Sequence, residues 1–308
     1  MRAAVQNDYG AAIAVEDMPM PSVTPDSVLI KVHASCVNPA DNKLRLGDLR
    51  DMMPLQFPHT PGFDVSGEIV EVGAEVTSLK KGDEVYACCF PSLVGCFAEY
   101  VSLKASDVAV KPPSLSHPEA ASLPLVALTA YQGLTEHGNL KSGQKVLIHA
   151  GTGGVGSVAI QIAKHLGAHV ATTCSGRNEA KVRALGADTV IDYRTQKFED
   201  VITDYDIVLD TIGGETRERS FSVLKEGGLV LSILGPRGDT PIPGKAGCRF
   251  IFYLIHGSST DLDTLSGMVE TGALHPVIDR AYPLSQVKEA LDYSHTGRAQ
   301  GKVVVNMV

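Results

Sequence analysis

Three glycines, Gly151, Gly153 and Gly156, have the spacing G-x-G-x-x-G and carry the clearest chemical meaning in this sequence. They follow the apolar run VLI at 146–148 and precede a segment whose apolar residues recur at helical spacing. A strand that turns sharply into a helix leaves the first N–H groups of that helix unpaired, and the helix dipole favours an anion beside them. We therefore expect a phosphate group to bind at this turn.

The pattern alone is a weak signal, because glycine-rich turns also serve plain packing of a strand against a helix. After a helix expected at 118–138, however, predicted strands and helices alternate, which requires parallel pairing and hence a doubly wound, Rossmann-type sheet. The glycine turn joins the first strand of this series to its helix. We therefore expect it to bind a dinucleotide through Thr152, Gly153, Gly154 and Val155.

The second strand of the series, HVATTC at 169–174, ends without the acidic residue that hydrogen-bonds the ribose 2′-hydroxyl in NAD sites. Ser175 and Arg177 follow it instead, and a hydroxyl with a guanidinium suits the 2′-phosphate of NADPH, which a carboxylate would repel. We therefore predict NADPH as the cofactor, with Tyr193 and Lys181 beside the adenosine. The alternatives are an Arg177 that is only a solvated loop residue and a Tyr193 that is only packed.

Residues 1–120 show a different rhythm, with short alternating apolar runs that proline and glycine interrupt. This pattern predicts a compact antiparallel barrel. The tail, 258–308, contains a helix, a short strand, a second helix and a closing strand, and we expect it to fold back onto the first domain. The nucleotide-binding domain, 121–257, is then an insertion between the two halves of the other domain.

The composition is that of a soluble globular chain, with 308 residues, 44% of them hydrophobic and 20% charged. The formal charge of -8 disfavours a nucleic-acid partner, which requires a basic surface. No apolar run reaches the roughly 20 residues that span a bilayer, and the first residues lack the features of a signal peptide, so we expect a cytoplasmic protein. The six cysteines show no metal-ligand spacing, and we expect them to be free thiols.

Several motifs extend along nearly the whole chain: VNPADNKLRLGD, HTPGFDVSGEIVEVG, LKKGDEVYA, AASLPLVALTAYQGL, AGTGGVG and GKVVV. Together they resemble the zinc-independent branch of the medium-chain dehydrogenases/reductases, the quinone oxidoreductase (zeta-crystallin-like) group. The first motif is most similar to the plant enone oxidoreductases and their quinone oxidoreductase homologues. The resemblance implies an α/β protein with a GroES-like β-barrel catalytic domain, a Rossmann nucleotide-binding domain and a homodimeric assembly.

The zinc enzymes of this superfamily bind a catalytic metal through a cysteine, a histidine-glutamate pair and a second cysteine. The resemblance places Asn38, Phe63 with Asp64, and about Leu125 at those positions, where no thiolate or imidazole remains. We therefore predict no metal. A pocket without a Lewis acid cannot easily expel hydride from an alcohol, but it can orient NADPH to reduce electron-poor quinones or α,β-unsaturated carbonyls.

By position in the first motif, the resemblance assigns catalytic roles to Asn38, Asp41 and Lys43. Lys43 would supply a cation or proton to the developing enolate oxygen, while Asn38 and Asp41 fix the geometry. The alternatives are a solvent-exposed helix lysine at 43 and a helix cap at 41. Further implied cofactor contacts are Thr129 and Tyr131 beneath the nicotinamide, unless these are core residues, backbone groups of Leu234 and Gly235 at the carboxamide, and Arg298 or Lys302 at the pyrophosphate.

Other functions remain open beside the NADPH-dependent reduction of quinones or enones. One is a 2-alkenal or enoyl reductase that acts on lipid-derived aldehydes or acyl thioesters, and pocket shape decides between the two. Another is an NADPH-binding redox sensor with little turnover, since fold alone does not fix function. The apolar segments GLVLSILG and CRFIFYLIHG could supply the dimer surface or could simply be core.

Overall fold

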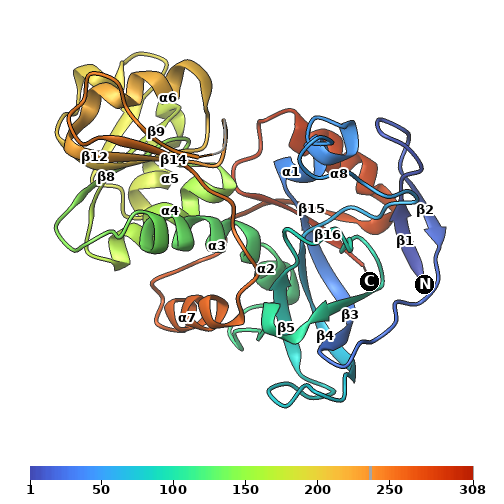
Figure 1. Cartoon of the computed structure of the whole chain (residues 1–308). Coiled ribbons are helices and arrows are strands. Elements are labelled where there is room, and N and C mark those ends of the chain that lie inside the picture. The colour runs from blue at the N-terminus through green and yellow to red at the C-terminus, as the bar shows by residue number, and fades with distance from the viewer. Residues whose placement is uncertain (236–237, 308) are drawn as a thin grey trace. The chain divides into compact units, whose positions relative to one another are not determined.

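The computed structural model describes residues 1–235 and 238–307, which form two units (Figure 1). The first unit comprises Met1–Leu125, His256–Thr271 and Pro276–Val308, and the second comprises Val126–Ile255 and Gly272–His275. The chain therefore returns to the first unit after passing through the second. The domain limits predicted at 120 and 257 stay a prediction, because a compact unit need not be a domain that folds alone.

The first unit contains a seven-stranded sheet in the order β15-β16-β3-β4-β5-β7, with β6 also paired to β3. Neighbouring strands are antiparallel except for β15 and β16, which are parallel. A separate antiparallel pair joins β1 (Arg2–Val5) and β2 (Ala14–Asp17). The strands of the sheet are β3 (Ser27–Val37), β4 (Asp64–Val72), β5 (Glu84–Cys88), β6 (Tyr100–Lys104), β7 (Val108–Val110), β15 (Ile278–Pro283) and β16 (Lys302–Asn306).

The helices of the first unit are α1 (Pro39–Leu46), α2 (His117–Ala121), α7 (Ser259–Glu270) and α8 (Val287–His295). Helix α1 begins directly after β3, because Pro39 is well suited to a first helical position. It ends at Gly47, whose φ of 88° is a left-handed conformation that glycine adopts without strain. The apolar face of α8 packs into a core cluster with the closing strand β16 and the end of β3.

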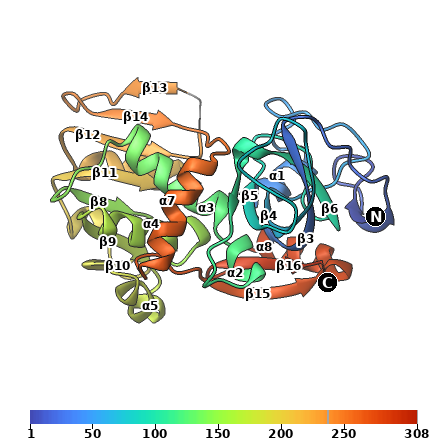
Figure 2. The same ribbon diagram turned by 90° about the horizontal axis from the view of Figure 1, so that it is seen from below.

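The second unit contains a seven-stranded sheet in the order β10-β9-β8-β11-β12-β14-β13, which can be followed in Figure 2. All neighbouring pairs are parallel except β13 and β14. The strand order reverses between β8 and β11, as in a doubly wound sheet, and confirms the predicted fold class. The strands are β8 (Lys145–Ile148), β9 (His169–Cys174), β10 (Thr189–Asp192), β11 (Tyr205–Asp210), β12 (Leu224–Ser232), β13 (Gly238–Pro241) and β14 (Arg249–Phe252).

The helices of this part of the chain are α3 (Pro124–Gln132), α4 (Gly154–His165), α5 (Glu179–Ala184) and α6 (Gly214–Ser220). The continuous helix expected at 118–138 is wrong. It is α2, then α3 beginning at Pro124, then a π-helical turn at Gly133–His137. Proline lacks the N–H that a helix interior needs, so it starts a new helix instead of continuing the first.

Strand β13 was not predicted, and it lies outside β14 at the edge of the described sheet. The apolar segments considered for a dimer surface are therefore interior strands, and Val230, Leu231 and Phe250 are buried core residues. Among the described residues, we find no helix with the length and apolar character needed to cross a membrane.

Candidate functional site

The turn from β8 to α4 gives its three glycines different environments. A Cβ on Gly151 would lie 2.2 Å from Thr172 Oγ1, and one on Gly156 would lie 2.2 Å from the Ala150 carbonyl oxygen. The packing of strand against helix therefore requires glycine at both positions. A Cβ on Gly153 would meet only the Ala150 carbonyl oxygen, at 3.3 Å. Glycine at 153 is not demanded by the fold itself.

The residues predicted to bind the dinucleotide, Thr152, Gly153, Gly154 and Val155, are all partly exposed. Gly153 is the N-cap of the 12-residue helix α4, and among the described residues no side chain caps it. The turn thus combines a helix N-terminus with backbone that a ligand can approach closely. Both properties fit the pyrophosphate of a dinucleotide.

At the end of β9, Ser175 is buried and Arg177 is exposed on the 3-10 turn Gly176–Asn178. Tyr193, at the end of β10, is 61% exposed, so it is not the packed tyrosine of the alternative interpretation. A basic and an aromatic side chain therefore remain available to a ligand at these two strand ends.

The structure also brings an acid to this place that sequence reasoning missed. Asp192 pairs in register with Cys174, so the end of β10 lies beside the end of β9. A Cβ on Gly176 would lie 2.5 Å from Asp192 Oδ2. Register between parallel strands carried the signal, since the acid belongs to the neighbouring strand and not to the one that the motif rule inspects. Arg177 and Asp192 together leave the choice between NADPH and NADH to be tested.

The loops after β11 and β12 are tied together by Asp210, which is fully buried. Its carboxylate accepts the N–H groups of Ile212 and Gly213 at 2.9 and 2.8 Å and the hydroxyl of Ser232 at 2.7 Å. The Leu234 N–H donates to the Ser232 hydroxyl oxygen at 3.1 Å. The Leu234 carbonyl oxygen accepts a hydrogen bond from the Arg217 guanidinium at 3.2 Å. Internal bonds thus already engage the Leu234 backbone, whereas Gly235, predicted beside it, is exposed.

Thr129 lies on α3 and is 4% exposed. Its carbonyl oxygen accepts a hydrogen bond from the Tyr253 hydroxyl at 2.8 Å, so α3 is anchored to the segment after β14. Tyr131 is partly exposed. Arg298 is exposed in the first unit, and its predicted contact with the pyrophosphate stays a prediction.

In the first unit, Asn38 and Asp41 lie together at the start of α1. Asp41 Oδ2 accepts the Asn38 N–H at 2.7 Å, and Oδ1 accepts the Gly62 N–H at 3.1 Å. Asp41 therefore has the helix-capping role that the sequence left as an alternative. Burial raises the pKa of Asp41 to about 7, although the Asn38 N–H, the Lys302 charge and the Gly62 N–H all lower it.

Lys43 lies two residues after Asp41 on α1 and is partly exposed. Across residues 1–235 and 238–307, its ammonium makes no hydrogen bond or ion pair, so it remains available to a substrate. Asn38, by contrast, is fully buried and donates from Nδ2 to Asp64 Oδ2 at 2.8 Å.

The suggestion that Lys302 reaches the pyrophosphate is wrong. Lys302 is only 4% exposed, and its ammonium donates to Asn38 Oδ1 and, at 3.1 Å, to Asp64 Oδ2. Burial is the largest single effect and lowers the pKa of this lysine, but the charge and hydrogen bond of Asp64, with smaller contributions from other neighbours, together outweigh it, and the net shift is upward. Sequence reasoning named Asp64 only at a lost metal-ligand position and Lys302 only as a contact of the pyrophosphate, and it did not predict that the two bond to each other.

A small cavity lies next to this cluster, beside the Asp41 carboxylate. His59 is buried there, and burial lowers its pKa to about 4, so its imidazole is neutral at physiological pH. The lining residues are Asp41, Leu44, His59, Thr60, Pro61, Gly62, Phe63, Leu93 and Gly95.

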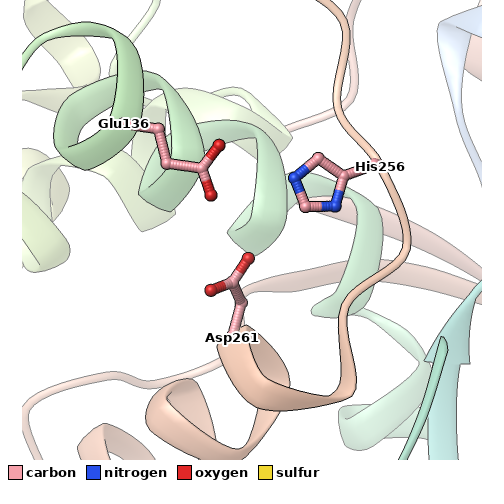
Figure 3. A group of neighbouring side chains, drawn as sticks. All are labelled: Glu136, His256 and Asp261. Atoms are coloured by element: carbon pink, nitrogen blue, oxygen red, sulfur yellow. The ribbon is translucent and has the colours of Figure 1, made fainter. Parts of the chain in front are cut away.

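Three side chains of metal-binding type are drawn in Figure 3: Glu136, His256 and Asp261. Glu136 belongs to the π-helical turn of the second unit, whereas His256 and Asp261 belong to the first. They define no site within either unit.

The doubly wound sheet with its glycine turn and the separate antiparallel sheet define a dinucleotide-dependent oxidoreductase of the alcohol dehydrogenase type. An alcohol dehydrogenase GroES-like domain matches residues 24–113, and a domain described as zinc-binding dehydrogenase matches residues 185–305. The chain is 40% identical to the 2-methylene-furan-3-one reductase of Solanum lycopersicum, over 100% of this chain and 79% of the relative.

Two further comparisons agree. The chain is 38% identical to the chloroplastic NADPH-dependent alkenal/one oxidoreductase of Arabidopsis thaliana, over 99% of this chain and 79% of that protein. The structure of the quinone oxidoreductase from Coxiella burnetii superposes with a TM-score of 0.89 at 35% identity, covering 100% of this chain and 99% of the other. The chain belongs to the medium-chain dehydrogenase/reductase family, in its quinone oxidoreductase and enone reductase group, as the sequence motifs indicate.

Proposed function

We propose that the protein is an NADPH-dependent reductase of quinones and α,β-unsaturated ketones that transfers hydride without a metal. The observation that carries this proposal is the turn between β8 and α4. Packing demands glycine at 151 and 156, but position 153 is open to a ligand at a helix N-terminus. Relatives named 2-methylene-furan-3-one reductase, alkenal/one oxidoreductase and quinone oxidoreductase support the acceptor class.

The nicotinamide cofactor, when bound, supplies the hydride. On this proposal Thr152, Gly153, Gly154 and Val155 hold its pyrophosphate by their backbone, while Ser175, Arg177 and Tyr193 hold the adenosine end. The proposal also includes four further contacts with the cofactor. Thr129 would lie beneath the nicotinamide, Leu234 and Gly235 beside its carboxamide, and Arg298 beside the pyrophosphate.

Reduction of an enone adds a hydride to the β-carbon and leaves negative charge on the carbonyl oxygen, which must then be stabilised and protonated. Lys43 is the proposed donor to this oxygen, because its ammonium is partly exposed and makes no bond within the described residues. Asn38 and Asp41 fix the start of the helix that carries it.

The test is an NADPH oxidation assay against a quinone, an enone, a 2-alkenal and an enoyl thioester. Fastest turnover with the quinone or enone supports the proposal, and preference for the alkenal or thioester replaces it with the alternative reductase. Tight NADPH binding without consumption of any acceptor would instead identify a redox sensor.

We also propose that the protein is a cytoplasmic homodimer, with domains at 1–120, 121–257 and 258–308. The compact units of the described residues support a division near these limits. A sedimentation experiment that gives a monomer at all protein concentrations would contradict the proposed homodimer. Limited proteolysis would test the domain limits by cleavage near residues 120 and 257.

A further inference from the structure

Three segments that are distant in the sequence meet at one end of three neighbouring strands of the first sheet. Asn38 directly follows β3, Asp64 opens β4 and Lys302 opens β16. Both β4 and β16 pair antiparallel with β3, so their first residues lie beside its last ones. Asn38 and Asp64 are fully buried, and Lys302 is 4% exposed.

The three side chains form hydrogen bonds to one another. The Lys302 ammonium donates to Asn38 Oδ1 and to Asp64 Oδ2, and Asn38 Nδ2 donates to the same Asp64 oxygen at 2.8 Å. The other carboxylate oxygen, Asp64 Oδ1, accepts the Leu125 N–H at 2.7 Å. Both oxygens of the carboxylate are therefore engaged.

A buried ammonium needs an anion beside it, because removing an isolated charge from water is costly. Asp64 supplies that anion, and the net upward shift in the pKa of Lys302 means that the lysine stays protonated. Burial also raises the pKa of the neighbouring Cys36 thiol, so this cysteine offers no thiolate.

The resemblance to the family places Asn38 and Asp64, the two residues bonded to Lys302, at positions where zinc-dependent members carry metal ligands. We propose that the Lys302 ammonium is the resident cation of this site, which takes the place of a metal ion between Asn38 and Asp64 and fixes the Asn38 side chain. An ammonium bonded to both groups keeps a divalent cation out.

The donor set does not fit zinc. Structural and catalytic zinc sites use three or four thiolate, imidazole or carboxylate ligands. Here the Asp64 carboxylate is already bonded through both oxygens, and Asn38 offers only an amide. Cys36 and Asp41 lie nearby, but among the described residues no three histidine, cysteine or carboxylate side chains gather their ligand atoms at this place. The cluster of Asn38, Asp64 and Lys302 is therefore not a zinc site on this proposal.

The first test is a double-mutant cycle on stability. Lys302→Met removes the charge and leaves Asp64 uncompensated, so we expect the Tm to fall by roughly 10 °C. Asp64→Asn leaves the ammonium uncompensated and should cost a similar amount. The double variant should lose much less than the sum of the two, because neither charge remains.

The matched control is Lys111→Met, which alters another buried lysine, 6% exposed, whose carboxylate partner Glu84 is exposed. Its effect should add to that of Asp64→Asn, since the two groups do not bond. If the losses of stability caused by Lys302→Met and Asp64→Asn are also additive, the proposed ion pair is refuted.

Two measurements on the unmodified protein complete the test. After dialysis against zinc, we expect no stoichiometric metal, and one tightly held zinc per chain would overturn the proposal. Under reductive methylation of the native protein, Lys302 should stay unmodified while Lys288, whose side chain is 60% exposed, is modified. Equal modification of the two would also overturn it. Because none of these readouts uses a carbonyl substrate, they test the resident cation even if the proposed acceptor class is wrong.

Discussion

Asp41 is a buried carboxyl group that is held by two backbone N–H donors and has a pKa raised to about 7 by burial. An unfolded aspartate has a pKa of about 3.9, so between these values the folded chain keeps a proton that the unfolded chain releases. Stability from this group is therefore fully present below about pH 4 and is lost as pH rises through about 7.

We predict that the stability of the wild type relative to Asp41→Asn decreases between pH 5.5 and 7.5, because only the wild type carries this titration. Thermal unfolding of both proteins at closely spaced pH values measures the difference. Curves that stay parallel across this interval would show that Asp41 does not titrate there.

Lys43 is the residue on which the proposed chemistry depends most directly. Lys43→Met keeps the length of the side chain but removes the cation, and we expect kcat for an enone to fall about 100-fold with little change in the KM for NADPH. Steady-state assays measure both constants. Lys31→Met is the control, since Lys31 is an exposed lysine of β3 and should leave turnover unchanged. Full turnover of Lys43→Met would end the proposed role.

We expect Arg177 and Asp192, which lie at the ends of neighbouring strands, to decide which cofactor is used. If Arg177 binds the 2′-phosphate, Arg177→Ala should raise the KM for NADPH roughly 10-fold or more and leave the KM for NADH almost unchanged. The control is Arg183→Ala on α5, where the guanidinium is already paired with Glu179 at 2.8 Å.

The companion variant is Asp192→Asn, which removes a carboxylate from beside a bound phosphate and should improve the use of NADPH. Wild-type enzyme that uses NADH and NADPH with equal efficiency would contradict this assignment. An Asp192→Asn variant that loses NADH activity alone would instead identify Asp192 as a ligand of the ribose hydroxyl.

Among the elements, the turn from β8 to α4 separates the demands of folding from those of binding. Gly151→Ala places a Cβ 2.2 Å from Thr172 Oγ1 and should destabilise the fold by about 1–3 kcal/mol. Gly153→Ala, at φ -75° and with a single close Cβ contact, 3.3 Å from the Ala150 carbonyl oxygen, should lower the Tm only slightly but weaken NADPH binding on the order of 10-fold.

Thermal unfolding and calorimetric titration with NADPH measure the two effects on matched proteins. Similar losses of binding in both variants, each explained by a lower Tm, would mean that the turn serves packing alone.

The sequence predicts elements well where a local pattern decides them. The alternation after residue 121 predicts the parallel sheet, and the glycine spacing predicts the turn at its first strand. Prediction fails where a contact depends on register or on a single proline. Asp192 reaches the end of β9 only because β10 pairs with it, and Pro124 divides one expected helix into two.

For the molecule as a whole, the first unit depends on both ends of the chain. Lys302 forms a hydrogen bond with Asn38, which lies 264 positions away in the sequence. No local sequence pattern predicts such a contact. The resemblance to known enzymes pointed to Asn38 and Asp41 as site residues, but it offered Lys302, as an alternative to Arg298, for contact with the pyrophosphate. A closing strand can be predicted from its valines, whereas the partner of its first side chain requires the assembled sheet.

All six cysteines of the chain are buried free thiols, distributed over both units. Burial raises the pKa of Cys36, Cys88 and Cys174, so thiolate, the reactive form, is scarce at neutral pH. We therefore predict that Ellman's reagent detects almost no thiol in the native protein and six in denaturant, since unfolding exposes every cysteine. A thiol that reacts rapidly before unfolding would contradict the burial of that residue. Only four thiols in denaturant without reductant would reveal a disulfide, and Cys89 with Cys96, whose sulfurs lie 3.6 Å apart, is the pair to examine.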